Sequence, residues 1–495
     1  MYFRKLIFLL FLFVVTAFSN IAVYGGQFTG EDESNQWVTT IRLIYSMNHG
    51  DIGEFGRVML LQDQPPLRYL LSIPGVMLWP HTEFGLRLVA ILFSFVMTYQ
   101  LYRLGVETGG EFVGVWSSLL IAASGVYNWT SMAFGWSITV VCMILVIRML
   151  RSGPLLLDNP DGKKRFVRSN LLVMVMFLVN TGNILFFFTL SAIVLWMNRK
   201  NWKQGLFFTG MAALYYACYY IVFFGLAARF DPAGEPVGQL AHNLQRSNEI
   251  LTGIGPLVAN LQGINAYFFP YLAWLILGLS LFALVKRERI VLAWLSLYLL
   301  AWTFLFSVST AQYFLLFFIA VFPFGLVELS RKLHPRQANF GYAFLLILVL
   351  LWNQQLFINR YGSDDPDYPT KLIRLGSAEI TRQHNIYEPY TSIVGDLKPI
   401  LRKGNFFVAD VSGSFTTFYY RKDPVEEGDG NYAGLLESKK FPVVFDAVDQ
   451  CYQPGWVTSM VSVVVTKSDF CLGGIEKIYS YPRSKIRVYL LNISQ

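Results

Sequence analysis

Acidic residues gather in the polar stretch 25–71, which separates two apolar regions of the chain. Glu31-Asp32-Glu33 lies near its start, and Asp63 lies near its end, just before Gln64-Pro65-Pro66-Leu67. Carboxylates close to hydrocarbon are costly unless they are paired or have a function. A positioned carboxylate can take a proton as a general base. The same acids could instead stabilise the N-terminus of a helix that begins near Gln36.

The four cysteines fall into two pairs. Cys142 and Cys218 lie inside apolar runs, where they are expected in the core or against lipid. Cys451 and Cys471 lie in the polar C-terminal region without further cysteine or histidine at zinc-ligand spacing. They are candidates for a disulfide if that region faces an oxidising compartment.

Charged residues are scarce in this chain, which is 54% hydrophobic and 15% charged, with a mean hydropathy of +0.44. Soluble proteins are about a quarter charged, so the composition indicates a polytopic membrane protein in contact with the lipid bilayer. The net charge of +8 is not evidence for a nucleic-acid partner. The basic residues cluster in short loops between apolar runs, as expected of cytoplasmic loops.

About eleven apolar stretches are candidates for membrane-spanning helices, which need about 20 mostly apolar residues. They are 5–24, 83–103, 110–128, 130–150, 167–182, 183–198, 204–228, 264–285, 290–309, 311–329 and 338–357. The first lacks a clear small-residue cleavage site, so we expect a retained helix rather than a signal peptide. The pair 167–198 could be two short helices or one long broken helix.

The basic loops predict the orientation of these helices. With a cytoplasmic N-terminus, the five most basic loops all face the cytoplasm. They lie near 102–103, 148–168, 198–203, 286–289 and 331–336. The first outer loop 25–82, the second outer loop 229–263 and everything after residue 357 then lie outside the cytoplasmic membrane.

Two segments of the first outer loop are expected to be helices at the membrane surface. The run 66–79 is apolar but too short to span a bilayer, and it contains Pro74. The run 36–47 shows helical spacing. Its expected apolar side is Trp37, Ile41, Ile44 and Tyr45, with Thr40, Arg42 and Ser46 off that side.

After residue 357 the composition changes to that of a small extracytoplasmic α/β domain, 358–495. Strands are predicted near 406–409, 441–445, 461–466 and 486–491, and helices near 370–383 and 392–403. The predicted fold class is therefore a polytopic α-helical membrane protein, with a transmembrane domain over 1–357 and a small C-terminal α/β domain.

An ordered set of motifs over roughly residues 1–335 resembles the GT-C superfamily of glycosyltransferases, which use polyprenyl-phosphate sugars. The protein O-mannosyltransferases and the lipid A aminoarabinose transferase look nearest. The motifs, in order, are Asp32-Glu33, Gly50-Asp51, Gln64-Pro65-Pro66-Leu67, Arg87-Leu88, and Tyr313 with Pro323. Gln64 stands where the family has Lys or His.

The resemblance implies a GT-C fold and an inverting, metal-independent sugar transfer from a polyprenyl-phosphate donor. The acceptor would be an extracytoplasmic lipid, glycan or protein. Asp32 matches the first acid of the family's pair, so it is the expected general base, with Glu33 as the alternative. The phosphate leaving group requires positive charge rather than a general acid.

Several residues could bind the donor on this resemblance. They are Asp63, Gln64, Arg87, His242, Arg246 and Tyr313. His242 and Arg246 would share one helical face, although a solvated loop or lipid-headgroup contacts explain Arg246 equally well. Arg57 and Arg68 are further candidates for contact with the phosphate, but for them a solvated loop or lipid-headgroup contacts are the favoured explanation. Asp63 and His242 are weak metal candidates, because two ligands make a poor site; no cofactor is expected.

Two other functions compete with this interpretation. A transporter or flippase of lipid-linked sugars would concentrate charge at mid-membrane and show repeats, whereas the charges here lie in an outer loop and no repeat is visible. An envelope glycan polymerase or ligase would have outer loops rich in arginine and histidine, and five histidines give that alternative little support.

Overall fold

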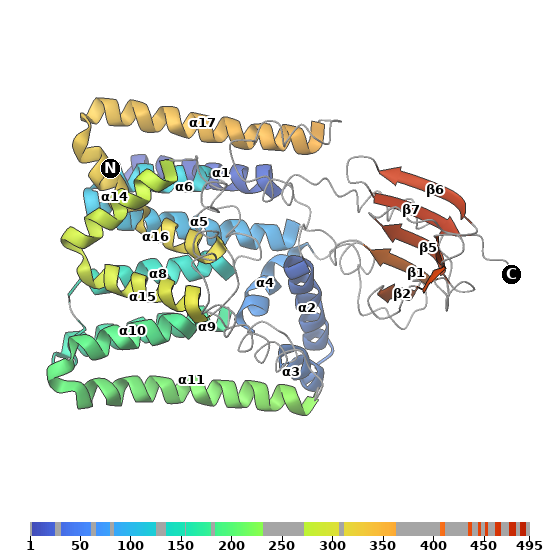
Figure 1. The fold of residues 1–495 in the computed structure, drawn as a ribbon, viewed down its shortest axis with the longest axis horizontal. Coiled ribbons are helices and arrows are strands. Elements are labelled where there is room, and N and C mark those ends of the chain that lie inside the picture. Colours follow the sequence, from blue (N-terminus) through green and yellow to red (C-terminus); the bar gives the residue numbers. More distant parts are fainter. Residues whose placement is uncertain are drawn as a thin grey trace.

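The computed structural model describes the backbone of residues 2–24, 31–60, 66–79, 84–124, 135–153, 155–179, 184–230, 272–305 and 311–362, together with seven strands between 406 and 491. Its long helices lie roughly side by side in one bundle (Figure 1). They are α1 (Tyr2–Tyr24), α5 (Phe84–Gly109), α6 (Glu111–Ala123), α8 (Gly135–Arg151), α9 (Pro160–Val179), α10 (Ile184–Met197), α11 (Trp202–Phe230), α14 (Leu272–Arg287), α15 (Arg289–Leu305), α16 (Ala311–Lys332) and α17 (Pro335–Gly362).

Each of the eleven apolar stretches predicted from the sequence overlaps one of these helices, although the bounds differ; α9 begins seven residues before the predicted stretch 167–182, and α17 extends five residues beyond 338–357. The uncertain pair 167–198 forms two helices, α9 and α10. Within the part of the chain that the structure describes, α5 alone is long and apolar enough to cross a membrane by length and composition, with a mean hydropathy of 1.6. The stretches 111–123, 185–197, 289–301 and 336–351 are shorter apolar helices.

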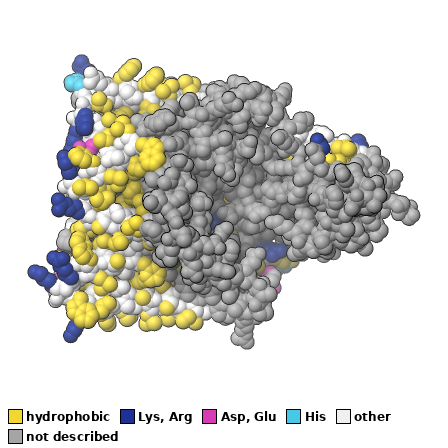
Figure 2. Space-filling view, in the orientation of Figure 1, with side chains coloured by type: hydrophobic (Ala, Val, Ile, Leu, Met, Phe, Trp, Pro, Cys, Tyr) yellow, Lys and Arg dark blue, Asp and Glu magenta, His cyan; other side chains and the backbone are white. Residues whose placement is uncertain are grey.

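Large apolar side chains cover the outside of the bundle, as the band of hydrophobic side chains in Figure 2 shows. On α17, Phe340, Phe344, Ile347 and Leu351 recur at helical spacing, and each is more than half exposed. Exposed apolar surface of this extent indicates contact with something other than water, and the acyl chains of a bilayer match it.

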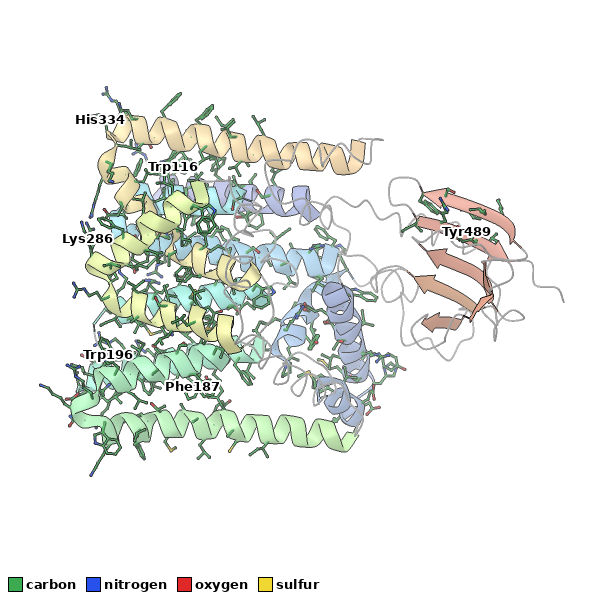
Figure 3. All side chains as sticks on the ribbon, viewed as in Figure 1. Trp116, Phe187, Trp196, Lys286, His334 and Tyr489 are labelled. Carbon is green, nitrogen blue, oxygen red and sulfur yellow. The ribbon has the colours of Figure 1, made fainter. Side chains whose placement is uncertain are left out.

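Lysine and arginine gather at one end of the bundle, which we call the basic end (Figures 2 and 3). Ion pairs join separate helices there. Arg148 of α8 pairs with Glu107 of α5, and Arg151 Nε lies 2.8 Å from Oε1 of Glu288, between α14 and α15. On α16, Glu328 accepts a hydrogen bond of 3.0 Å from Arg331. Three of the predicted basic loops, 148–168, 286–289 and 331–336, therefore supply ion-paired residues to this end. The predicted loop at 102–103 is wrong, because these residues lie inside α5, which continues to Gly109.

Three further helices lie at the opposite end of the bundle and form what we call the cap (Figure 1). They are α2 (Glu31–Asn48), α3 (Ile52–Leu60) and α4 (Leu67–Leu78). The expected surface helices 36–47 and 66–79 correspond to α2 and α4. Pro74 lies inside α4, and its missing N–H removes one helical hydrogen bond.

The strands form a five-stranded sheet in the order β2-β1-β5-β7-β6, which lies beyond the cap end in Figure 1. The strand β1 runs parallel to β2 and β5, and β7 is antiparallel to β5 and β6. The strands are β1 (Phe406–Asp410), β2 (Gly434–Glu437), β5 (Val461–Thr466), β6 (Ile475–Tyr481) and β7 (Ile486–Leu491).

The predicted strands at 406–409, 461–466 and 486–491 are confirmed as β1, β5 and β7. The prediction at 441–445 overlaps only the start of β3 (Val444–Asp446), which pairs antiparallel with β4 (Cys451–Gln453). We did not predict β2, β4 or β6. Among the described strands, β6 pairs only with β7, and it carries Glu476 and Lys477, as suits an edge strand. The predicted helices 370–383 and 392–403 lie outside the described residues.

Gly75 and Gly85 bring α4 against the start of α5. A Cβ atom on Gly85 would lie 2.5 Å from the carbonyl oxygen of Gly75 and 2.9 Å from that of Trp79. Backbone oxygens cannot move aside as a flexible side chain would. This close contact sets the position of the cap on the bundle.

We therefore expect Gly85→Ala to lower the free energy of unfolding by about 1–3 kcal/mol, because overpacking forces the two backbones apart. Gly278→Ala in α14 is the matched control, since a Cβ at Gly278 meets nothing within 4 Å. Thermal unfolding of the purified protein in detergent measures both. An equal effect of the two substitutions would contradict the close-contact account.

Candidate functional site

The cap has a small core of its own. Leu43 of α2, Val58 of α3 and Tyr69 of α4 are buried together, with Phe55 and Met59 packed against them. The helix α3 also contacts α11, and α4 contacts α5 and α9. The cap is therefore anchored to the bundle at several points rather than attached only by its ends.

The buried face of α2 differs from the predicted one. Trp37 is fully buried as expected, but Tyr45 is 42% exposed, while Thr40 and Ser46 are buried. The hydroxyls can be buried because each bonds to the helix backbone: Thr40 Oγ1 donates to the Gln36 carbonyl at 2.7 Å, and Ser46 Oγ to that of Leu43 at 3.0 Å. A satisfied hydroxyl costs far less to bury than a free one.

The Gly50-Asp51 turn noted in the sequence joins α2 to α3. Gly50 has φ +67°, a left-handed conformation that glycine adopts without steric cost. The Asp51 backbone N–H donates to the Ser46 carbonyl at 2.9 Å. The Asp51 carboxylate accepts a hydrogen bond of 2.8 Å from the Glu54 N–H, and so caps the N-terminus of α3.

A buried hydrogen-bond network joins α2 to α4. Arg68 Nε donates to Gln36 Oε1 at 2.7 Å, and Gln36 Nε2 donates to Ser72 Oγ at 2.7 Å. The Ser72 hydroxyl donates in turn to the Arg68 carbonyl at 3.0 Å. Arg68 is only 7% exposed and Gln36 is 1% exposed. The network therefore lies in the interior of the cap.

The expectation that Arg68 is a solvated side chain is wrong, because Arg68 is buried. An arginine beside two prolines in a polar stretch is usually on the surface. In the structure, α4 begins at Leu67 and turns Arg68 inward on the same side as Ser72, four residues later. This four-residue spacing within an otherwise apolar helix was the signal available in the sequence.

The structure places only part of the predicted site. Asp32 and Glu33 lie in the first turn of α2 and Tyr313 in the first turn of α16. Arg87 lies in the first turn of α5 and is 4% exposed. Cys451 lies in β4. The other predicted residues lie outside the described residues, namely Asp63, Gln64, His242, Arg246 and Cys471.

The described part of the chain contains no group of three or more His, Cys, Asp or Glu side chains placed to hold a metal ion. The weak metal candidates Asp63 and His242 lie outside that part, so their pairing stays a prediction.

Two solved structures share this architecture along almost the whole chain. Both are of ArnT from Cupriavidus metallidurans. The structure bound to undecaprenyl phosphate has a TM-score of 0.58 at 12% identity, and the apo structure has 0.57 at 13%. Each match covers 99% of this chain and 98% of ArnT. An Archaeoglobus fulgidus oligosaccharyltransferase matches at a TM-score of 0.45 and 13% identity, over 92% of this chain and 67% of its own.

No family model matches the sequence, and no curated protein matches it at a significant level. The likeness therefore rests on the arrangement of helices. The chain has a GT-C fold, as its ordered motifs predicted.

Gln36 gives a test of the network. In Gln36→Ala, the Arg68 Nε loses its acceptor, and a lost hydrogen bond to a charged group costs about 1.5–3 kcal/mol. We expect backbone amides of α4 to exchange about 10- to 100-fold faster, measured by hydrogen–deuterium exchange.

Asn48→Ala is the control for this experiment. It removes an amide from an exposed position at the end of the same helix and should leave exchange in α4 unchanged. Equal exchange in α4 of the two variants would show that the network does not hold α4 in place.

Proposed function

We propose that this protein is an integral membrane glycosyltransferase that transfers a sugar from a polyprenyl-phosphate donor to an extracytoplasmic acceptor. The observation that carries the proposal is the likeness to ArnT bound to undecaprenyl phosphate, which extends over 99% of the chain. A shared fold does not by itself fix a function, so the cap and its residues have to supply the chemistry.

The distribution of charge supports the proposed orientation in the cytoplasmic membrane. Lysines and arginines gather at the end opposite the cap (Figure 2), and the N-terminus lies at that same end (Figure 1). Positive residues remain on the cytoplasmic side of a membrane. The N-terminus would therefore be cytoplasmic, and the cap and the C-terminal sheet would be on the outer, periplasmic or extracellular side.

In the proposed reaction, an acceptor hydroxyl on a lipid, glycan or protein attacks the anomeric carbon of a donor hexose or pentose. The new carbon–oxygen bond forms as the bond between the anomeric carbon and the phosphate oxygen breaks. The electron pair of the breaking bond leaves with the phosphate. Attack opposite the leaving group inverts the anomeric carbon. Asp32 takes the hydroxyl proton, with Glu33 as the alternative base.

The leaving phosphate needs positively charged side chains that donate hydrogen bonds to its oxygens. Arg87 is buried near the start of α5, the helix on which α4 packs. His242, Arg246, Gln64, Asp63 and Tyr313 are further proposed contacts to the donor, carried over from the motifs. The exposed apolar surfaces of helices such as α17 suit a donor whose tail stays in the bilayer.

Asp32→Asn tests the base. Membranes from cells that make the protein are given undecaprenyl-phosphate-linked glucose, mannose or aminoarabinose, and release of undecaprenyl phosphate is followed by mass spectrometry. This product is common to any acceptor. We expect Asp32→Asn to slow its release by about 100-fold or more, the range found for removal of a general base.

Glu31→Gln is the matched control. If the acids only stabilise the start of α2, both substitutions cost about 0.3–1 kcal/mol in stability and neither stops transfer. Normal release by a stable Asp32→Asn protein would exclude Asp32 as the base. Movement of lipid-linked sugar across the membrane without release of undecaprenyl phosphate would favour the transporter alternative.

A further inference from the structure

Arg68 is a buried cation, and among the described residues only one of its guanidinium nitrogens has a hydrogen-bond acceptor. Its Nε is engaged by Gln36, and no described residue accepts a hydrogen bond from its two Nη atoms. Gln36 is neutral, so it orients the guanidinium without balancing its charge. A buried charge without a counterion costs several kcal/mol, which indicates that an anion belongs beside Arg68.

The geometry of the network fixes the direction of the unused donors. The guanidinium is planar and rigid, so holding Nε on Gln36 Oε1 also sets the plane of both Nη groups. Gln36 is itself held, because its Nε2 donates to Ser72 Oγ at 2.7 Å and lies 3.4 Å from the Arg68 carbonyl. The result is a preoriented pair of donors, the arrangement that binds two oxygens of one phosphate.

The helix that carries Arg68 favours a lipid phosphate. While Arg68 is buried, Leu70, Met77 and Leu78 on other sides of the same helix are exposed, Met77 and Leu78 by more than half. A short helix with both a buried cation and exposed apolar side chains suits a ligand with an anionic group on a hydrocarbon tail. A sugar hydroxyl would leave the charge of Arg68 unbalanced.

We propose that the two Nη groups of Arg68 bind the phosphate of the polyprenyl-phosphate donor, and that Gln36 and Ser72 are positioning residues for that contact. This inference rests on the proposed function and assigns to Arg68 the phosphate contact that the sequence left as the less favoured of two explanations.

Phosphate preference is the quantity to measure. The full-length protein in detergent is titrated with undecaprenyl phosphate and, separately, with undecaprenol, which has the same tail without the phosphate. Native mass spectrometry gives the ratio of the two affinities. We expect Arg68→Gln to reduce this ratio about 10- to 100-fold, because the charge-assisted hydrogen bonds to the phosphate are lost, with little change in undecaprenol binding.

Three further variants complete the experiment. Arg42→Gln removes a cation from the same cap at a partly exposed position of α2 and should leave the ratio unchanged. Gln36→Ala should lower the ratio by less than Arg68→Gln does, since it frees the guanidinium without removing it. Arg68→Lys keeps the charge but lacks the planar pair of donors, so its ratio should fall between the wild-type and Arg68→Gln values.

The outcomes separate this inference from the proposed function. If the wild-type protein binds the two lipids equally, the proposed use of a polyprenyl-phosphate donor fails and the role of Arg68 fails with it. If the wild-type protein prefers the phosphate and Arg68→Gln keeps that preference, the function stands and Arg68 serves a carboxylate of the chain instead. If Arg68→Gln does not fold, an unchanged ratio in Arg68→Lys overturns the inference, and a reduced ratio supports it.

Discussion

The hydrogen bond between Arg68 Nε and Gln36 Oε1 is the constraint on which the cap depends. It places a charge in the interior, where charge is tolerated only with good partners. The contact links α2 to α4 across 32 positions of sequence. Because α4 in turn packs on α5 at Gly75 and Gly85, the network also fixes α2 relative to the bundle.

The two ends of the bundle use charge differently. At the basic end, Arg148, Arg151 and Arg287 pair with carboxylates on neighbouring segments, so much of the charge is neutralised within the protein. In the described part of the cap, Arg68 has a neutral amide as its partner. Paired charge supports structure, whereas a buried charge without a counterion is typical of a functional site. A charged substrate would therefore bind at the cap rather than at the basic end.

Much of the fold was predictable, because helix length and apolarity are local properties of the sequence. The eleven long helices and the strands β1, β5 and β7 follow from such patterns. The buried face of α2 did not, since Thr40 and Ser46 are buried through hydrogen bonds to their own helix. Arg68 was also misjudged, because its environment depends on Gln36 in another helix. Side-chain partners distant in sequence leave no periodic signal. The roles of Asp63, Gln64, His242 and Arg246 stay predictions, because these residues lie outside the part of the chain that the structure describes.

The likeness to ArnT at 12% identity shows that this architecture tolerates almost complete replacement of its side chains. Apolar helices can exchange residues of similar size without losing their packing, but a reaction centre cannot. In the proposed reaction, the base and the leaving phosphate must lie on opposite sides of the anomeric carbon, with little tolerance in distance. Asp32 lies one turn before Gln36 in α2, and Gln36 bonds to Arg68 in α4. If Asp32 is the base and Arg68 binds the phosphate, the side chain of Gln36 would set the separation between them. Activity would then depend on the geometry of the cap more than on the fold of the bundle.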